Sequence, residues 1–76
     1  MSKPISNSKF RKLIKAMPAE KQRESLERSL RVLPQFILEE AGRVDGHYNP
    51  KVVKFLESRL RTARNLWSEY LIENHA

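Results

Sequence analysis

The chain has no cysteine and only two glycines, and each shortage narrows the possible folds. Without cysteine there are no disulfides and no thiolate metal ligands, a usage that fits a reducing compartment and leads us to expect a cytoplasmic protein. With so little glycine, and with no Asn-Gly or Gly-Pro pair, the usual hairpin signals are missing. Leucine, glutamate, lysine and arginine are abundant instead, so the composition predicts an all-α fold.

Long apolar runs are also missing. No stretch approaches the roughly 18 apolar residues that a membrane-spanning helix needs, and the first residues lack the apolar core of a signal peptide. We therefore expect no membrane partner. The 76 residues suffice for one domain with a small core. The polar character of residues 1–8 predicts a flexible N-terminal tail, followed by a single helical domain over residues 9–76.

Residues suited to catalysis or metal binding are scarce. The two histidines, His47 and His75, have no partner at ligand spacing, and no glycine-rich phosphate loop is present. Glu39 and Glu40 are adjacent, so on a helix their side chains point about 100° apart and do not form a carboxylate pair. The sequence therefore predicts a protein that is not an enzyme, with no catalytic residues, metal, cofactor or small-molecule substrate.

The clearest element covers residues 49–73. Asn49 is a preferred N-cap residue, and Pro50 occupies the first helical position, where proline is well tolerated. Apolar residues then recur at spacings of three and four, which places them on one side of a helix about 35 Å long. They are Val53, Leu56, Leu60, Ala63, Trp67 and Tyr70, and the stripe is widened at its edges by Val52, Phe55, Leu66 and Leu71.

Two further helical segments precede this long helix. Residues 9–17, capped by Ser8, carry an apolar face, and Pro18 ends this segment and starts the next one, which runs to a cap at Gly42. Pro34 interrupts the second apolar stripe and predicts either a kink or a break with a new helix. Asp45 and Gly46 predict a turn before the long helix.

These segments predict a compact bundle of three to four helices with the long C-terminal helix as its spine. The apolar arc of that helix is wide, and the segments before it, which a break at Pro34 would divide into three, offer little surface to cover it. We therefore expect self-association, in the form of a two-fold homodimer.

The formal net charge is +6, and most of the excess lies early in the chain, because residues 1–31 contain nine basic and three acidic side chains. Such a charge favours phosphate or acidic partners. Two basic groups stand out on the predicted helices. The first has no acidic neighbour and fills the arc opposite the apolar face of residues 9–17, and the second lies on the polar side of the long helix. The first comprises Lys9, Arg11, Lys12 and Lys15; the second comprises Lys54, Arg61 and Arg64.

Several interpretations of these residues remain open. The basic face of residues 9–17 fits contact with phosphates, a solvated helix back or a membrane-surface helix. Trp67 and Tyr70 suit either the core or stacking on bases, and their place on the apolar stripe favours the core. Arg59 falls on the apolar side of its helix, where its stem covers apolar surface with the head in water, or its head pairs with Glu39 or Glu40.

The function that we expect from this surface is that of a small non-enzymatic regulatory or accessory protein that binds nucleic acid through its basic helical surface. The alternative is a protein-binding module, such as an inhibitor or small subunit of a larger nucleic-acid-handling enzyme, whose acidic surface the same cations would recognise. Small size, high charge and the absence of a motif are typical of accessory proteins of bacteriophages and mobile elements. Charge alone does not distinguish DNA, RNA and an acidic protein surface as the partner.

Overall fold

The computed structural model of the chain describes residues 5–43 and 49–74. These residues form three helices, α1 (Asn7–Lys15), α2 (Ala19–Ala41) and α3 (Pro50–Glu73), and contain no strand. The prediction of an all-α fold is confirmed, with three helices. The predicted turn at Asp45 and Gly46, both histidines and the first four residues of the predicted tail lie outside the described residues.

The long helix begins and ends where its local signals place it. The side chain of Asn49 accepts a hydrogen bond of 3.0 Å from the backbone N–H of Lys51, and Pro50 is the first helical residue. At the other end, the backbone N–H of Asn74 donates to the carbonyl of Tyr70. The predicted span is confirmed. It could be predicted from sequence because capping depends on residues within one turn of the helix end.

Helix α1 lies two residues earlier than predicted. Ser6, and not Ser8, is its N-cap, and the Ser6 hydroxyl accepts a hydrogen bond of 3.1 Å from the backbone N–H of Lys9. The earlier start makes Asn7 a helical residue, and its side-chain amide donates to the Ser58 hydroxyl on α3 at 2.7 Å. Ser6 and Ser8 are both suitable N-cap residues. The start at Ser6 is the one that places Asn7 in the helix, where its side chain contacts Ser58 of α3.

Helix α2 continues through Pro34, so of the two predicted alternatives, a kink or a break, the break does not occur. Because proline has no N–H, the carbonyl of Leu30 loses its usual helical donor. Gly42 caps the helix at a φ of −89°, which any residue adopts. Glycine is needed there for space, since a Cβ at this position would approach the carbonyl oxygen of Leu38 to 2.9 Å.

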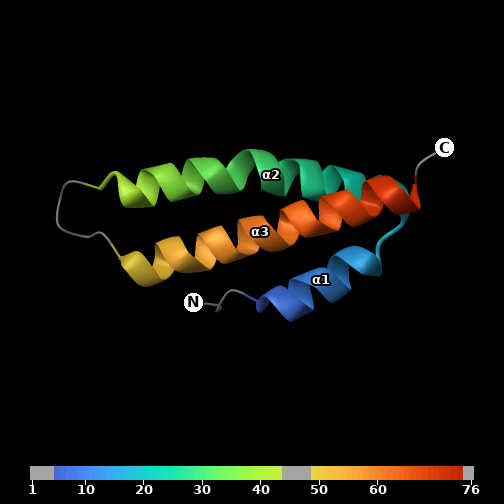
Figure 1. The fold of residues 1–76 in the computed structure, drawn as a ribbon, viewed down its shortest axis with the longest axis horizontal. Helices are drawn as coiled ribbons and strands as arrows, with labels where there is room; N and C mark the ends of the chain where they lie inside the picture. The colour runs from blue at the N-terminus through green and yellow to red at the C-terminus, as the bar shows by residue number, and fades with distance from the viewer. Residues whose placement is uncertain (1–4, 44–48, 75–76) are drawn as a thin grey trace.

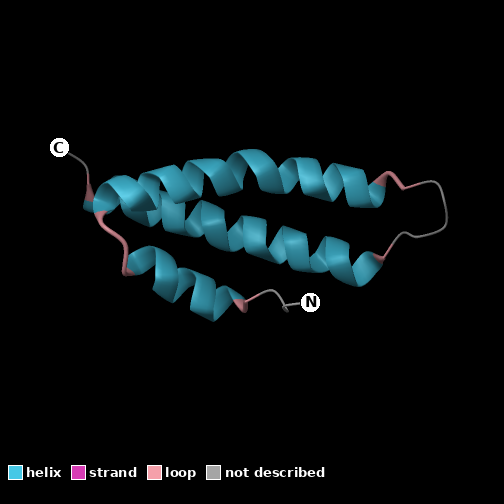
Figure 2. Cartoon of the chain, turned by 180° about the vertical axis from the view of Figure 1, so that it is seen from behind, coloured by secondary structure: helices cyan, strands magenta, loops and turns pink. Residues whose placement is uncertain are grey.

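The three helices are arranged as an antiparallel pair with a short third member. Helices α2 and α3 run side by side in opposite directions, and α1 lies beside the second half of α3 and points the same way (Figure 1). The view from behind shows the same order (Figure 2). The molecule measures 48 × 23 × 15 Å along its principal axes, so the bundle is elongated and flat. None of the described helices is long and apolar enough to cross a membrane.

A flat arrangement of this kind leaves a small core. Among the described residues the buried apolar side chains come from all three helices, and they are Ile14, Leu26, Leu60, Ala63 and Leu66. Leu66, which the sequence placed at the edge of the stripe, is only 1 % exposed. Val52 and Leu71, its supposed equivalents, are exposed. The difference arises because Leu66 belongs to the same core cluster as Ile14 of α1.

The core assignment predicts a large contrast between two leucines of α2. Leu26 is fully buried and Leu38 is 73 % exposed. Leu26→Ala should destabilise the protein by about 2–5 kcal/mol, which is much of the stability of a domain this small. Leu38→Ala, with the same chemical change on the same helix, should change the free energy of unfolding by less than about 0.5 kcal/mol. Chemical denaturation of both variants measures the contrast, and equal effects would show that the core is misassigned.

Candidate nucleic-acid interface

The fold divides the four cations of α1 into two pairs with different roles. The Arg11 guanidinium contacts both carboxylate oxygens of Glu69, at 2.6 and 2.7 Å. The Lys15 ammonium contacts Glu69 at 2.9 Å and Glu73 at 2.8 Å. These four side chains form a continuous ion network between α1 and α3, which we call the ion ladder. The sequence predicts that all four α1 cations fill the arc opposite the apolar face, and the structure corrects this for Arg11 and Lys15, which lie on the side of α1 that meets the carboxylates of α3.

The ladder follows from a match of spacings. Arg11 and Lys15 are four residues apart on α1, Glu69 and Glu73 are four apart on α3, and the two helices run in the same direction. Residues four apart share one face of a helix, so each pair presents two charges in a row. The matched spacing is visible in the sequence, but it becomes informative only when the two helices are known to be neighbours.

The contacts in the ion ladder stabilise the charged forms of Glu69 and Lys15. Hydrogen bonds from Arg11 and then from Lys15 hold the pKa of the Glu69 carboxyl below its ordinary value of 4.5. Hydrogen bonds to Glu73 and then to Glu69 raise the pKa of Lys15 above 10.5. Both groups remain charged at neutral pH, and part of the positive charge of α1 is neutralised by its neighbour.

Lys9 and Lys12 are the α1 cations that stay available. Both are exposed, and neither forms an ion pair within residues 5–43 and 49–74. On α1, Lys9 lies away from the side that carries Arg11 and Lys15, and Lys12 lies between Lys9 and that side, three residues before Lys15. The outward basic surface of this helix therefore consists of two lysines.

Arg59 forms the second attachment of α1. Its guanidinium carbon lies 4.5 Å from the centre of the Phe10 ring and 5.0 Å from that of Phe55, so the cation contacts one ring from each helix. Its Nε donates to the Asn7 side-chain oxygen at 2.7 Å, and a terminal nitrogen donates to the carbonyl of Ile5. We call this group the arginine clamp. It attaches the first turn of α1, whereas the ladder attaches the last.

The clamp replaces both interpretations that the sequence suggested for Arg59. The head does not pair with Glu39 or Glu40, and Glu40 instead contacts Arg43 at 3.2 Å. The guanidinium is partly buried between aromatic rings and not extended into water, and burial lowers the pKa of Arg59 below its ordinary value. A guanidinium stays protonated under all physiological conditions, so the clamp is permanently cationic.

The second basic group lies on the open side of α3. Lys54, Arg61 and Arg64 are all exposed, and none forms an ion pair within the described part of the chain. We call these three residues the α3 strip. By helical periodicity, Glu69 lies on the edge of α3 between the strip and α1. A carboxylate therefore separates the strip from the side of α3 that faces α1.

Two aromatic side chains of α3, Trp67 and Tyr70, stack on each other. The rings of Trp67 and Tyr70 stack with centroids 5.5 Å apart and planes inclined by 18°, and both residues pack against the buried core cluster. This packing favours the core interpretation over stacking on bases. Phe36 on α2 is 48 % exposed, as expected for an edge residue.

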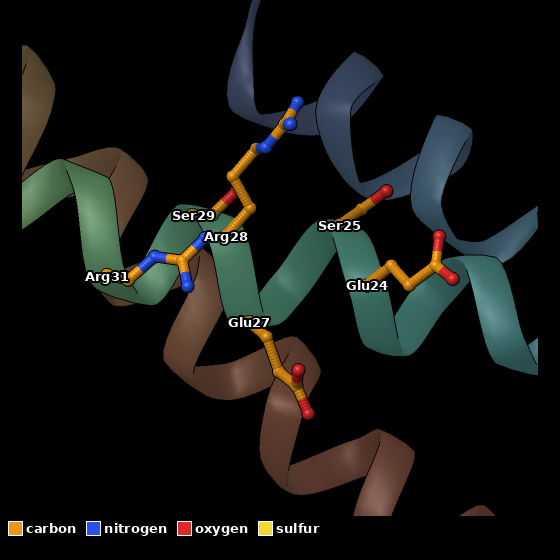
Figure 3. A pocket seen from close by; sticks show the side chains of 6 residues that line it. All are labelled: Glu24, Ser25, Glu27, Arg28, Ser29 and Arg31. Atoms are coloured by element: carbon orange, nitrogen blue, oxygen red, sulfur yellow. The ribbon is translucent and has the colours of Figure 1, made fainter.

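Two of the hollows on the described surface involve helix α2. One lies along α2 alone and mixes glutamates, arginines and serines, with Glu27 and Arg28 pointing to opposite sides of the helix (Figure 3). The other is a groove between α2 and α3 with an apolar floor, and it includes Arg61 and Arg64 of the α3 strip. Within the described residues no three His, Cys, Asp or Glu side chains gather as metal ligands.

Comparison with protein-family models, with curated proteins and with solved structures finds no match to this chain. A function therefore has to be proposed from the surface chemistry of the structure.

The arginine clamp predicts a local effect on α1. Arg59→Ala removes two ring contacts and two hydrogen bonds, so docking of α1 should weaken by roughly 1–2 kcal/mol. Hydrogen exchange should then accelerate for the amides of α1 while the middle of α3 stays protected. Arg61→Ala, two residues further along on the solvent side, is the matched control and should leave α1 protection unchanged. Equal protection of α1 in both variants would contradict the clamp.

The ion ladder predicts a pH-dependent contribution to stability. A carboxyl whose pKa is lower in the folded state stabilises the fold above its unfolded pKa, and this contribution is lost as the pH falls through the folded pKa. For Glu69 the contribution should be present above pH 4.5 and lost below it. The difference in Tm between wild type and Glu69→Gln should therefore shrink on acidification.

Thermal melts at neutral and acidic pH measure that difference. Glu57→Gln is the control, since Glu57 is an exposed glutamate of the same helix with no ion pair among the described residues. A Tm difference for Glu69→Gln that does not change with pH would show that the ladder does not persist in solution.

Proposed function

We propose that the protein is a small non-enzymatic accessory protein that binds nucleic acid through its phosphates, with the α3 strip as the principal contact. The supporting observation is the strip itself, because Lys54, Arg61 and Arg64 are exposed and free of ion pairs within the described residues. Lysine and arginine side chains that neutralise phosphates release condensed counterions, which supplies most of the affinity of non-specific binding.

The geometry of the strip favours contact with a backbone over the reading of bases. By the rise of an α-helix, Lys54 lies about 10 Å from Arg61 along the axis, and Arg64 about 5 Å further on. Trp67 and Tyr70 pack against the core, so they do not form an open platform for bases. Phosphate contacts position a protein without reading sequence, so we expect little sequence preference.

The α1 cations contribute unequally in this proposal. Lys9 and Lys12 face solvent and add a second, separate phosphate contact. Arg11 and Lys15 are held in the ion ladder, where a phosphate would have to compete with Glu69 and Glu73. We therefore assign these two residues mainly to the attachment of α1.

A protein-binding module is the second candidate function. The observation that favours it is the apolar surface left uncovered on the described residues, including Leu38 at 73 % and Phe36 at 48 % exposure. Such a module would act as an inhibitor or small subunit of a larger enzyme that handles nucleic acid. Homodimer formation is compatible with both functions.

The proposal predicts the salt dependence of binding. Replacing Lys54, Arg61 and Arg64 by glutamine should flatten the log–log salt slope on duplex DNA by up to about 3 units, at roughly 0.9 per phosphate contact. The loss should be similar for unrelated sequences, because base edges are not read. Titration of labelled duplex DNA and single-stranded RNA at several salt concentrations gives the slopes.

A second triple variant distinguishes the effect of the α3 strip on binding from the effect of net charge alone. Replacing Arg23, Arg28 and Arg31 of α2 by glutamine removes the same number of positive charges from a segment that also contains glutamates, and it should flatten the slope less. Equal slopes for the two triple variants would show that net charge alone drives binding. If wild type binds no oligonucleotide more tightly than about 100 μM at low salt, the protein-binding module becomes the leading function.

A further inference from the structure

The groove between α2 and α3 has an apolar floor and charged edges. Its α3 side lies on a different part of that helix from Ser58, Arg59 and Glu69, which contact α1. The apolar lining comes from both helices and comprises Pro34, Ile37, Leu38 and Leu60. The charged lining comes from α3 alone and comprises Glu57, Arg61 and Arg64.

The apolar lining differs from scattered exposed leucines. Single apolar side chains on a surface are common, but neighbouring ones in a concave patch mark binding sites. Leu38 is 73 % exposed and adjoins Pro34 and Ile37 in the same lining. A partner with apolar side chains would therefore remove from water a surface that the fold leaves open.

The charges of the groove select among possible occupants. Arg61 and Arg64 form no ion pair within residues 5–43 and 49–74, and Glu57 is the one acidic residue in the lining. A second copy of this chain would bring a further net charge of +6 toward these arginines. Nucleic acid would meet the arginines with phosphates but would leave the apolar floor unmatched. A partner segment with an apolar stripe flanked by carboxylates would match both the apolar lining and the two arginines.

We propose that this groove binds an acidic amphipathic α-helix of a partner protein. The charged lining spans residues 57–64, which is about 10 Å or two helical turns, long enough to receive apolar anchors spaced three, four and seven residues apart. The anchors lie on Pro34 and Leu38, and the carboxylates of the partner lie over Arg61 and Arg64. Glu57 at the opposite end repels carboxylates there and sets the direction of the bound helix.

A synthetic peptide tests the proposal on the full-length protein. The probe is a fluorescein-labelled helix of about 18 residues, with leucines at alternating spacings of three and four and glutamates on the flanks. A second peptide carries lysines in place of the glutamates. Fluorescence anisotropy should give a Kd of about 10–100 μM for the acidic peptide and at least about tenfold weaker binding for the basic one. Equal affinities for the two peptides would overturn the proposal.

Single substitutions locate the binding surface. Leu38→Asn should weaken acidic-peptide binding about tenfold, and it should fold normally because the side chain is exposed. Ile72→Asn is the control, since Ile72 is also exposed, at 78 %, but lies near the other end of α3. Unchanged peptide affinity in Leu38→Asn, or the same loss in Ile72→Asn, would overturn the assignment to this groove.

Two further measurements separate this inference from the alternatives. Leu38 is not part of the α3 strip, so Leu38→Asn should leave nucleic-acid affinity unchanged, whatever the titrations of the strip variants show. Sedimentation equilibrium of the chain alone tests the second copy as occupant. A dimer that Leu38→Asn dissociates would overturn the proposal in favour of self-association through the groove.

Discussion

The contact of the Arg59 guanidinium with the rings of Phe10 and Phe55 is the interaction on which the placement of α1 beside α3 depends. Helix α1 has nine residues, and an isolated helix of that length is not stable in water. It persists because Phe10, Ile14 and Met17 pack into the core, and the clamp and the ion ladder hold its two ends against α3. Its Ile14 is 3 % exposed and belongs to the same buried cluster as Leu66 of α3, which is 1 % exposed.

The same attachment redistributes the charge of the molecule. A helix that carries four cations and no acid in its sequence has two of them matched by Glu69 and Glu73 in the fold. The chain keeps its net charge of +6, but on α1 the cations without ion pairs within the described residues are Lys9 and Lys12, and the α3 strip adds three more. Phosphate recognition depends on that local availability and not on the total.

Arg61 and Arg64 belong both to the proposed phosphate-binding strip and to the proposed helix-binding groove. A phosphate backbone and an acidic helix would use the same two guanidinium groups, so the two ligands would compete at this edge. Competition of this kind suits an accessory protein, because a protein partner could then displace nucleic acid without any change of fold. The coupling would be electrostatic and would weaken as salt rises.

The sequence by itself determined the elements whose signals are local. The cap at Asn49, Pro50 at the first helical position and the spacing of apolar residues act within one or two turns, and they sufficed for α3 and for the all-α class. Continuity through Pro34 was left open, and the start of α1 was predicted two residues late. The tertiary structure decided the environments of Arg59 and Glu69, because their hydrogen-bond partners on or beside α1 lie more than 50 residues away in the chain. Which cations of α1 are paired depends on how α1 lies against α3, and no local pattern specifies that.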